Sequence, residues 1–148
     1  MALALLATSC GGGGGGPLTK AEFEAQLGSI FREIQNKALP AVIRVSPADP
    51  KQAVRRLKDA ETTLHDDASK LAEMKPPANA VAATSQLAAA LSRIADRVTA
   101  ARKDAEKGDF GRLEQFKVQI ANDPAVAQAR DAVVQLVNLG YDVAGPGP

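Results

Sequence analysis

The chain has 148 residues, of which 45% are hydrophobic, 24% are charged and only 3% are aromatic. This length suits a single domain. Eighteen Lys and Arg residues against seventeen Asp and Glu residues give a formal net charge of +1. Such an even mixture argues against nucleic-acid binding, which needs a basic surface for the phosphate backbone. The charges are unevenly distributed, because none precedes Lys20.

Residues 1–10 form a short apolar run that closes on two small residues and on Cys10, the only cysteine of the chain. The run is too short to cross a bilayer, which takes about 20 apolar residues. It resembles the lipobox at the end of bacterial lipoprotein signal peptides, through the motif Leu6-Ala7-Thr8-Ser9-Cys10. The resemblance implies cleavage after Ser9 and a diacylglyceryl group on the Cys10 thiol. A signal peptide begins with basic residues, so we expect that Met1 is not the initiator or that the chain was trimmed.

The glycines Gly11–Gly16 follow Cys10 directly. As a random coil, six glycines reach about 15 Å, and two acyl chains anchor a domain stably where one does not. A phosphate-binding loop is excluded, since no Gly-Lys-Ser/Thr follows the glycines. The alternative to a lipid anchor is an ordinary disordered amino terminus with a chance cysteine. We expect a signal-peptide remnant at residues 1–9, a lipidated cysteine and tether at 10–17, a helical domain at 18–141 and a disordered tail at 142–148.

Alanine occurs 29 times, and high alanine with few aromatic residues favours closely packed helices. The first helix begins with a capping box, because Thr19 and Glu22 have the required spacing. We expect it to end near Ala38, since Pro40 disfavours helical geometry at the residue before it. Residues 40–48 are expected to form a connector that covers one end of the core, with Val42–Val45 either an extended segment or a short turn of helix. The expected buried face of this helix consists of Phe23, Leu27, Ile30, Phe31 and Ile34.

The second and third helices are expected to form an antiparallel hairpin, because only a few residues around Pro76 and Pro77 separate them. The second helix begins at Asp49-Pro50, an N-cap followed by a proline. The third ends at Lys107-Gly108. Apolar residues repeat along both at steps of three and four. These residues are Ala53, Leu57, Ala60, Leu64, Ala68, Leu71 and Met74 in the second helix, and Thr84, Leu87, Leu91, Ile94, Val98, Ala101 and Ala105 in the third.

The last helical segment begins at Asp109, is interrupted at Asn122 to Pro124 and ends before Gly140. Its expected apolar positions are Phe110, Leu113, Phe116, Ile120, Val126, Ala129, Val133, Leu136 and Val137. Four amphipathic units joined by short connections predict an all-α fold, an antiparallel up-down four-helix bundle whose fourth helix is interrupted near Pro124.

Metal and haem sites are not expected. A di-iron bundle needs two Glu-x-x-His pairs, whereas the chain has one histidine, His65, which lies four residues after Glu61. His65 and Met74 are nine residues apart on one helix, about 13 Å at a rise of 1.5 Å per residue, so they cannot ligate one iron together. We expect His65 to be a boundary histidine; the alternative is a pH-sensing pair with a neighbouring carboxylate.

Enzymatic motifs are equally lacking. Ser46, Ser69, Ser85 and Ser92 do not lie in Gly-x-Ser-x-Gly. Gly108-Asp-Phe-Gly111 contains the Asp-Phe-Gly letters of kinases, but here Asp109 is expected to cap a helix. The basic group of Lys51, Arg55, Arg56 and Lys58 is flanked by Asp49, Asp59 and Glu61. It is expected to form a solvated, salt-bridged face rather than a contact with anionic headgroups.

The helical body resembles uncharacterised small helical lipoproteins and secreted proteins of actinobacteria. The likeness lies in Leu18-Thr-Lys-Ala-Glu-Phe23, Ile30-Phe-Arg-Glu33, Leu71-Ala-Glu-Met-Lys-Pro-Pro77, Gly108-Asp109 and Leu139-Gly-Tyr141. Many members have a cysteine late in the first helix and another after the closing Leu-Gly, so the resemblance implies a disulfide at these places. In this chain Phe31 and the segment 142–144 stand near those places. The resemblance implies an extracytoplasmic location and no known activity.

We therefore expect a lipid-anchored helical bundle on the extracytoplasmic face of the cell membrane, a binding or structural module of the envelope and not an enzyme. Cys10 is the expected lipidation site, membrane lipid is the expected partner, and neither cofactor nor metal is expected. Two alternatives remain: a cofactor- or metal-carrying bundle or small enzyme, and an oligomer in which the heptads of the third helix pack between chains. The protein or small-molecule partner is not predicted.

Overall fold

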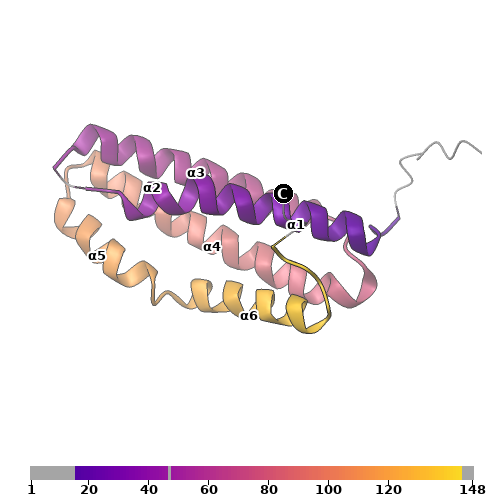
Figure 1. The fold of residues 1–148 in the computed structure, drawn as a ribbon. Helices are drawn as coiled ribbons and strands as arrows, with labels where there is room; N and C mark the ends of the chain where they lie inside the picture. The colour runs from indigo at the N-terminus through magenta and orange to yellow at the C-terminus, as the bar shows by residue number, and fades with distance from the viewer. Residues whose placement is uncertain (1–15, 47, 145–148) are drawn as a thin grey trace, which may run out of the picture.

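The computed structural model describes residues 16–46 and 48–144, and every regular element in these ranges is helical. The helical units run up, down, up and down as one elongated bundle (Figure 1). This confirms the predicted all-α four-helix bundle with an interrupted fourth helix. Its elements are α1 (Lys20–Glu33), a π-helical segment (Ile34–Ala38), α2 (Leu39–Ile43), α3 (Pro50–Glu73), a 3-10 turn (Ala78–Ala80), α4 (Val81–Glu106), α5 (Phe110–Ile120) and α6 (Pro124–Asn138).

The first helical unit does not end near Ala38, so that prediction is wrong. It passes through the π-helical segment and continues as α2 to Ile43. The backbone N–H of Leu39 donates to the Ile34 carbonyl, five residues back. In a regular α-helix, Pro40 would clash with the carbonyl four residues before it and would remove a hydrogen bond. The wider π-helical turn directly before Pro40 gives the chain another hydrogen-bonding pattern there, and the helix survives the proline.

The predicted helix starts are confirmed by side-chain caps. The Thr19 hydroxyl accepts from the Glu22 N–H at 3.3 Å, and the Glu22 carboxylate accepts from the Thr19 N–H at 2.9 Å. Asp49, Asp109 and Asp123 each accept a backbone N–H of the helix that follows. Each cap satisfies a donor that would otherwise lack an intrahelical partner.

Two helix ends depend on glycines in the left-handed region. Gly108 has φ of 78° and Gly140 has φ of 83°. After each glycine the chain turns back: the Asp109 N–H donates to Asp104, and the Tyr141 N–H donates to Leu136. Together with the bonds from the two glycine N–H groups, these are Schellman caps, which need a residue that tolerates positive φ. The predicted stops at Gly108 and Gly140 are therefore confirmed.

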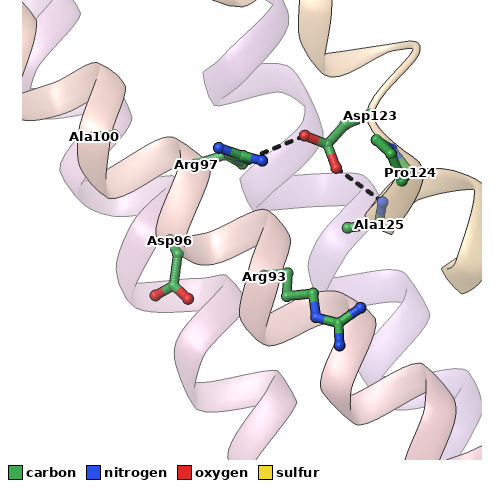
Figure 2. A pocket seen from close by; sticks show the side chains of 7 residues that line it. All are labelled: Arg93, Asp96, Arg97, Ala100, Asp123, Pro124 and Ala125. Carbon is green, nitrogen blue, oxygen red and sulfur yellow. Dashed lines mark hydrogen bonds and ion pairs between the residues drawn. The ribbon is translucent and has the colours of Figure 1, made fainter.

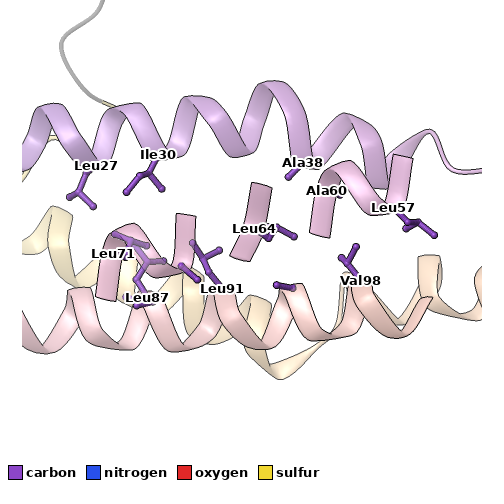
Figure 3. Packing of buried hydrophobic residues seen from close by; sticks show 14 of the residues in the cluster. Leu27, Ile30, Ala38, Leu57, Ala60, Leu64, Leu71, Leu87, Leu91 and Val98 are labelled. Carbon is purple, nitrogen blue, oxygen red and sulfur yellow. The ribbon is translucent and has the colours of Figure 1, made fainter. Parts of the chain in front are cut away.

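The core runs along the bundle between the first helical unit, α3 and α4 (Figure 3). Most predicted stripe positions of α1, α3 and α4 are buried, whereas in α5 and α6 only Leu113 and Leu136 are, and most of the others are half-buried. Val137 is an exception, since it is 51% exposed. Val45 is buried next to the connector, which confirms that this stretch covers one end of the core. The largest side chains with under 2% exposure are Phe23, Leu27, Leu57, Leu71, Leu87, Leu113 and Leu136.

Three distant segments meet where α1 begins, which we call the amino-terminal end of the bundle (Figure 1). The Leu18 N–H donates to the Lys75 carbonyl at 2.7 Å, and the Tyr141 hydroxyl bonds Asn79 Oδ1 at 2.6 Å. The Tyr141 ring also meets Phe23 edge to face, with centroids 5.0 Å apart. The opposite end contains α2, the connector to α3 and the turn from α4 to α5.

The packed part of the chain extends beyond Tyr141, although the sequence predicts a disordered tail from residue 142 onward. The Asp142 N–H donates to Glu24 at 2.9 Å, and Val143 packs against the core. These contacts hold residues 142–144 against the first helix, because backbone and side chain both have partners there. Residues 145–148 lie outside the described part of the chain.

Candidate functional site

A group of four charged residues joins the first helical unit to α3, and we call it the Asp67 network. Lys70 Nζ lies 2.8 Å from Asp67 Oδ1 and 2.7 Å from Glu33 Oε2. The other oxygen of Glu33 lies 2.6 Å from Lys37 Nζ. Lys70 therefore bridges two carboxylates at the point where α1 passes into the π-helical segment.

Asp67 is the most unusual member of this network, because its side chain is fully buried. Its Oδ2 atom has no hydrogen-bond partner among the described residues. Burial raises the pKa of Asp67 above its usual value, although the hydrogen bond from Lys70 acts in the opposite direction. Hydrogen bonds from Lys37 and Lys70 lower the pKa of Glu33 to about 2. The bonds to Asp67 and Glu33 raise the pKa of Lys70, so the bridging ammonium stays charged.

A second charged group links α3 to α4. Arg102 Nε donates to Glu61, whose other carboxylate oxygen accepts from the Thr99 hydroxyl at 2.9 Å. Arg102 also donates to Glu106, one turn further along α4, at 2.6 Å. The bond from Arg102 lowers the pKa of Glu61. Since Glu61 engages both neighbours through its two oxygens, this group holds the helix pair together rather than offering an open site.

A hollow lies on the surface between α4 and the break that separates α5 from α6, and we call it the α4–α6 cleft (Figure 2). Its volume is about 350 Å³, within the range of small-molecule sites, about 300–1,000 Å³. Two arginines one helical turn apart and two aspartates supply its charge. The lining residues are Arg93, Asp96, Arg97, Ala100, Asp123, Pro124 and Ala125.

The charges of this cleft are partly used within the protein. Arg97 Nε donates to Asp123 Oδ2 at 3.0 Å, while Asp123 Oδ1 accepts from the Ala125 N–H at 2.8 Å. Arg93 donates to Gln128 Oε1 at 2.6 Å. Guanidinium groups bind carboxylates and phosphates well, but Asp96 and Asp123 balance the two positive charges. The cleft therefore suits a small polar ligand that carries both signs of charge better than a simple anion.

A second hollow, of about 240 Å³, lies between the first helix and α6. We call it the Phe31 groove. It is lined by Phe31, Arg32, Gln35, Val133, Val143 and Ala144. The two places at which the family resemblance suggests cysteines, near Phe31 and residues 142–144, thus meet at one groove. Apolar side chains occupy them in this chain.

Cys10, the expected lipidation site, lies outside the described residues, as do Gly11–Gly15. His65 is 43% exposed, and its Nε2 lies 4.0 Å from Asp96 Oδ1 of α4. The carboxylate that faces His65 therefore comes from the neighbouring helix and not from Asp66 or Asp67.

The basic group of α3 is exposed or half-buried. Its only side-chain contact in the described part of the chain runs from Arg56 to the Arg44 carbonyl at 3.2 Å. The expected salt bridges to Asp49, Asp59 and Glu61 are not formed there, because Glu61 is turned toward Arg102 instead.

Among residues 16–46 and 48–144, no group of three or more His, Cys, Asp and Glu side chains is placed to hold a metal ion. In the same ranges, no helix combines the length and apolar character that a membrane span requires. Both hollows and the Asp67 network escaped the sequence analysis. A signal existed for Asp67, since it follows Leu64 by three residues and precedes Leu71 by four, on the apolar face of α3.

No known family model, no curated protein and no solved structure matches this chain.

Proposed function

We propose that this protein is a lipid-anchored, extracytoplasmic helical bundle that serves as a binding or structural module of the cell envelope. The observation that carries the proposal is the order of three features in the sequence. Small residues precede the only cysteine, Cys10, and six glycines follow it. A diacylated cysteine supplies two acyl chains, which suffice for stable membrane anchoring.

The start of the folded domain suits a short tether. Gly16 is exposed, and the capping box at Thr19 begins the first helix only three residues later. The chain therefore changes from a glycine tract to a capped helix within a few residues. Six glycines reach about 15 Å as a random coil, so an acylated Cys10 would hold the bundle just outside the headgroups.

The α4–α6 cleft supports the binding part of the proposal. It combines a volume of about 350 Å³ with two guanidinium groups and two carboxylates. Its walls belong to α4 and α6, which pack along each other, so a ligand would meet a site on rigid helices. The ligand class that fits is a small polar molecule with both positive and negative groups.

Labelling with radioactive palmitate tests the anchor, in a bacterium that processes lipoproteins and with a basic, apolar signal-peptide start supplied before Met1. We expect label on the wild type and none on Cys10→Ser, because the Cys10 thiol is the group that accepts the diacylglyceryl unit, whose acyl chains contain the label. Ser9→Ala keeps a small residue before the cysteine and serves as the matched control, which should be labelled like the wild type. Absence of label, or equal labelling of Cys10→Ser, would refute the anchor.

A further inference from the structure

The amino-terminal end of the bundle exposes three aliphatic side chains. Val81 is 48% exposed at the start of α4, while Val137 and Leu139 are 51% and 43% exposed at the end of α6. Val81 belongs to a different helix from Val137 and Leu139 and lies far from them in the sequence. The packing of α4 against α6 shows whether they share one level along the bundle.

The register of α4 and α6 places them together. Gln135 of α6 bonds Gln86 of α4, and Gln128 of α6 bonds Arg93 of α4. The two helices are therefore antiparallel, and seven residues forward along α4 correspond to seven residues backward along α6. Five residues before Gln86 is Val81, and five residues after Gln135 is Gly140. Val81 therefore lies at the same height along the bundle as Gly140. Gly140 follows Leu139 by one residue and Val137 by three. Since an α-helix rises 1.5 Å per residue, the three side chains lie within about 5 Å of one another along the bundle axis.

The tether leaves the bundle at the same end. The Leu18 N–H bonds the Lys75 carbonyl in the α3–α4 connector, a few residues before Val81. Lys20 lies 5.9 Å from the centre of the Tyr141 ring, just beyond Leu139. Gly16 is therefore close to this surface, and Cys10 lies only six positions before Gly16 in the sequence. Even fully extended, six residues span about 21 Å, so an anchored Cys10 keeps this end near the membrane at all times.

Charge at this end is mixed. Lys20 is exposed, and its ammonium lies 3.7 Å from Glu24. Glu22 and Glu73 are exposed near it. A surface of this kind has no strong attraction for anionic headgroups, so the aliphatic side chains must supply the contact. Three such side chains are too few to bind a membrane on their own, but a short tether gives the surface a high effective concentration beside the bilayer.

We propose that Val81, Val137 and Leu139 form a lipid-contact surface that inserts into the headgroup boundary of the membrane in which Cys10 is anchored. This inference rests on the proposed lipid anchor. It sets the orientation of the bundle, with α2 and the α4–α5 turn furthest from the membrane. The α4–α6 cleft, midway along the bundle, then stays open to solvent.

The chain contains no tryptophan, so one introduced tryptophan reports its own position by fluorescence. The full chain is purified with its Cys10 thiol free and coupled through that thiol to a maleimide lipid in phosphatidylcholine vesicles. Quenching by lipids with brominated acyl chains then reports membrane contact of Val81→Trp and Leu139→Trp. Ile43→Trp is the matched control, because Ile43 is 64% exposed and lies at the opposite end. Circular dichroism verifies that each variant keeps its helicity.

We expect the Val81 and Leu139 reporters to be quenched at least about twofold more than the Ile43 reporter, since only their end enters the boundary region. Adding Val137→Ser to Leu139→Trp should lower the quenching. Equal quenching at both ends would overturn the proposal, as would concentration-dependent burial of the reporters without vesicles, which would indicate a second copy of the chain.

Coupling Cys10 to a maleimide lipid tests the lipid-contact surface without natural acylation, so the two proposals can fail separately. Missing palmitate on the natural protein would refute lipid anchoring, whereas missing quenching on coupled vesicles would refute only the lipid-contact surface.

Discussion

The two ends of the bundle are closed in different ways. At the amino-terminal end, polar bonds and an aromatic pair join segments far apart in the sequence, as in the bond of Tyr141 to Asn79. The opposite end is closed by the buried Val45 and by local caps, with one long-range bond from Arg56 to the backbone of Arg44. Both ends expose aliphatic side chains, so exposure alone does not distinguish them. What distinguishes them is the proposed tether, because the glycine tract precedes the end that is cross-linked most firmly.

The largest difference between the ends should appear on truncation of Phe23. This side chain is fully buried against Tyr141, and a Phe→Ala change in a core costs about 3–5 kcal/mol because a cavity remains. Ile43→Ala at the opposite end removes a side chain that is 64% exposed and should change stability by less than about 0.5 kcal/mol. Urea unfolding followed by circular dichroism measures both. Similar losses in the two variants would contradict the contrast between the ends.

The two glycine caps provide a matched pair, one at each end. Gly140 and Gly108 have φ of 83° and 78°, and a left-handed conformation costs a residue with a Cβ about 1–2 kcal/mol. Gly140→Ala and Gly108→Ala should therefore lose similar amounts in thermal unfolding. Gly111→Ala is the control, because its Cβ would meet Asp109 Oδ1 at an ordinary 3.7 Å and alanine favours a helix interior. A stable Gly140→Ala variant would show that the Schellman cap contributes little.

The hydroxyl of Tyr141 should have a smaller effect. Tyr141→Phe keeps the ring against Phe23 and removes only the 2.6 Å bond to Asn79, which is worth about 1 kcal/mol. A double-mutant cycle with Asn79→Ala isolates this bond. The loss of unfolding free energy caused by Asn79→Ala should be smaller in the Tyr141→Phe background than in the wild type. Fully additive losses would mean that the two side chains do not interact in solution.

The Asp67 network lies between the two ends and should add a pH dependence to the whole bundle. The pKa of Glu33 is lowered from 4.5 to about 2, so its contribution is present above pH 4.5 and is lost as the pH falls toward 2. Since Glu33 is partly exposed, the contribution should be reduced to below about 1 kcal/mol. Glu33→Gln should therefore lose less stability than the wild type on acidification over that range.

Asp67 acts in the opposite direction, because a raised pKa in the folded state gives stability that is lost as the pH rises. Burial is the main cause of the raised Asp67 pKa and Glu33 a lesser one, so most of this contribution is common to Glu33→Gln and the wild type. Equal slopes between pH 4.5 and 2 would show that the bonds from Lys37 and Lys70 do not hold the Glu33 carboxylate in its charged form.

Sequence reasoning succeeded where the signal is local. Capping residues such as Thr19, Asp49 and Asp123 act within three residues of themselves, and Gly108 and Gly140 end helices for a reason contained in their own backbone. Apolar steps of three and four then place the helices in a bundle. The whole architecture follows from these local rules.

The errors concern features that depend on more than one element. Pro40 predicts a helix end, yet the π-helical segment before it lets the helix continue. Val137 continues an apolar stripe but is 51% exposed, because the face of α6 that is buried contains Ala125, Ala132 and Leu136. The burial of Asp67 requires Lys70 and, from another helix, Glu33. The α4–α6 cleft exists only because the break at Asp123 lies across from Arg97.

Mass spectrometry of the amino-terminal tryptic peptide tests the lipid anchor most directly, with the chain expressed behind a basic, apolar signal-peptide start in a bacterium that processes lipoproteins. The proposed function predicts a peptide from Cys10 to Lys20 that carries a diacylglyceryl group on the cysteine, and its loss in Cys10→Ser. A peptide that still contains residues 1–9 with a free Cys10 thiol would contradict both the anchor and the membrane-facing role of the amino-terminal end.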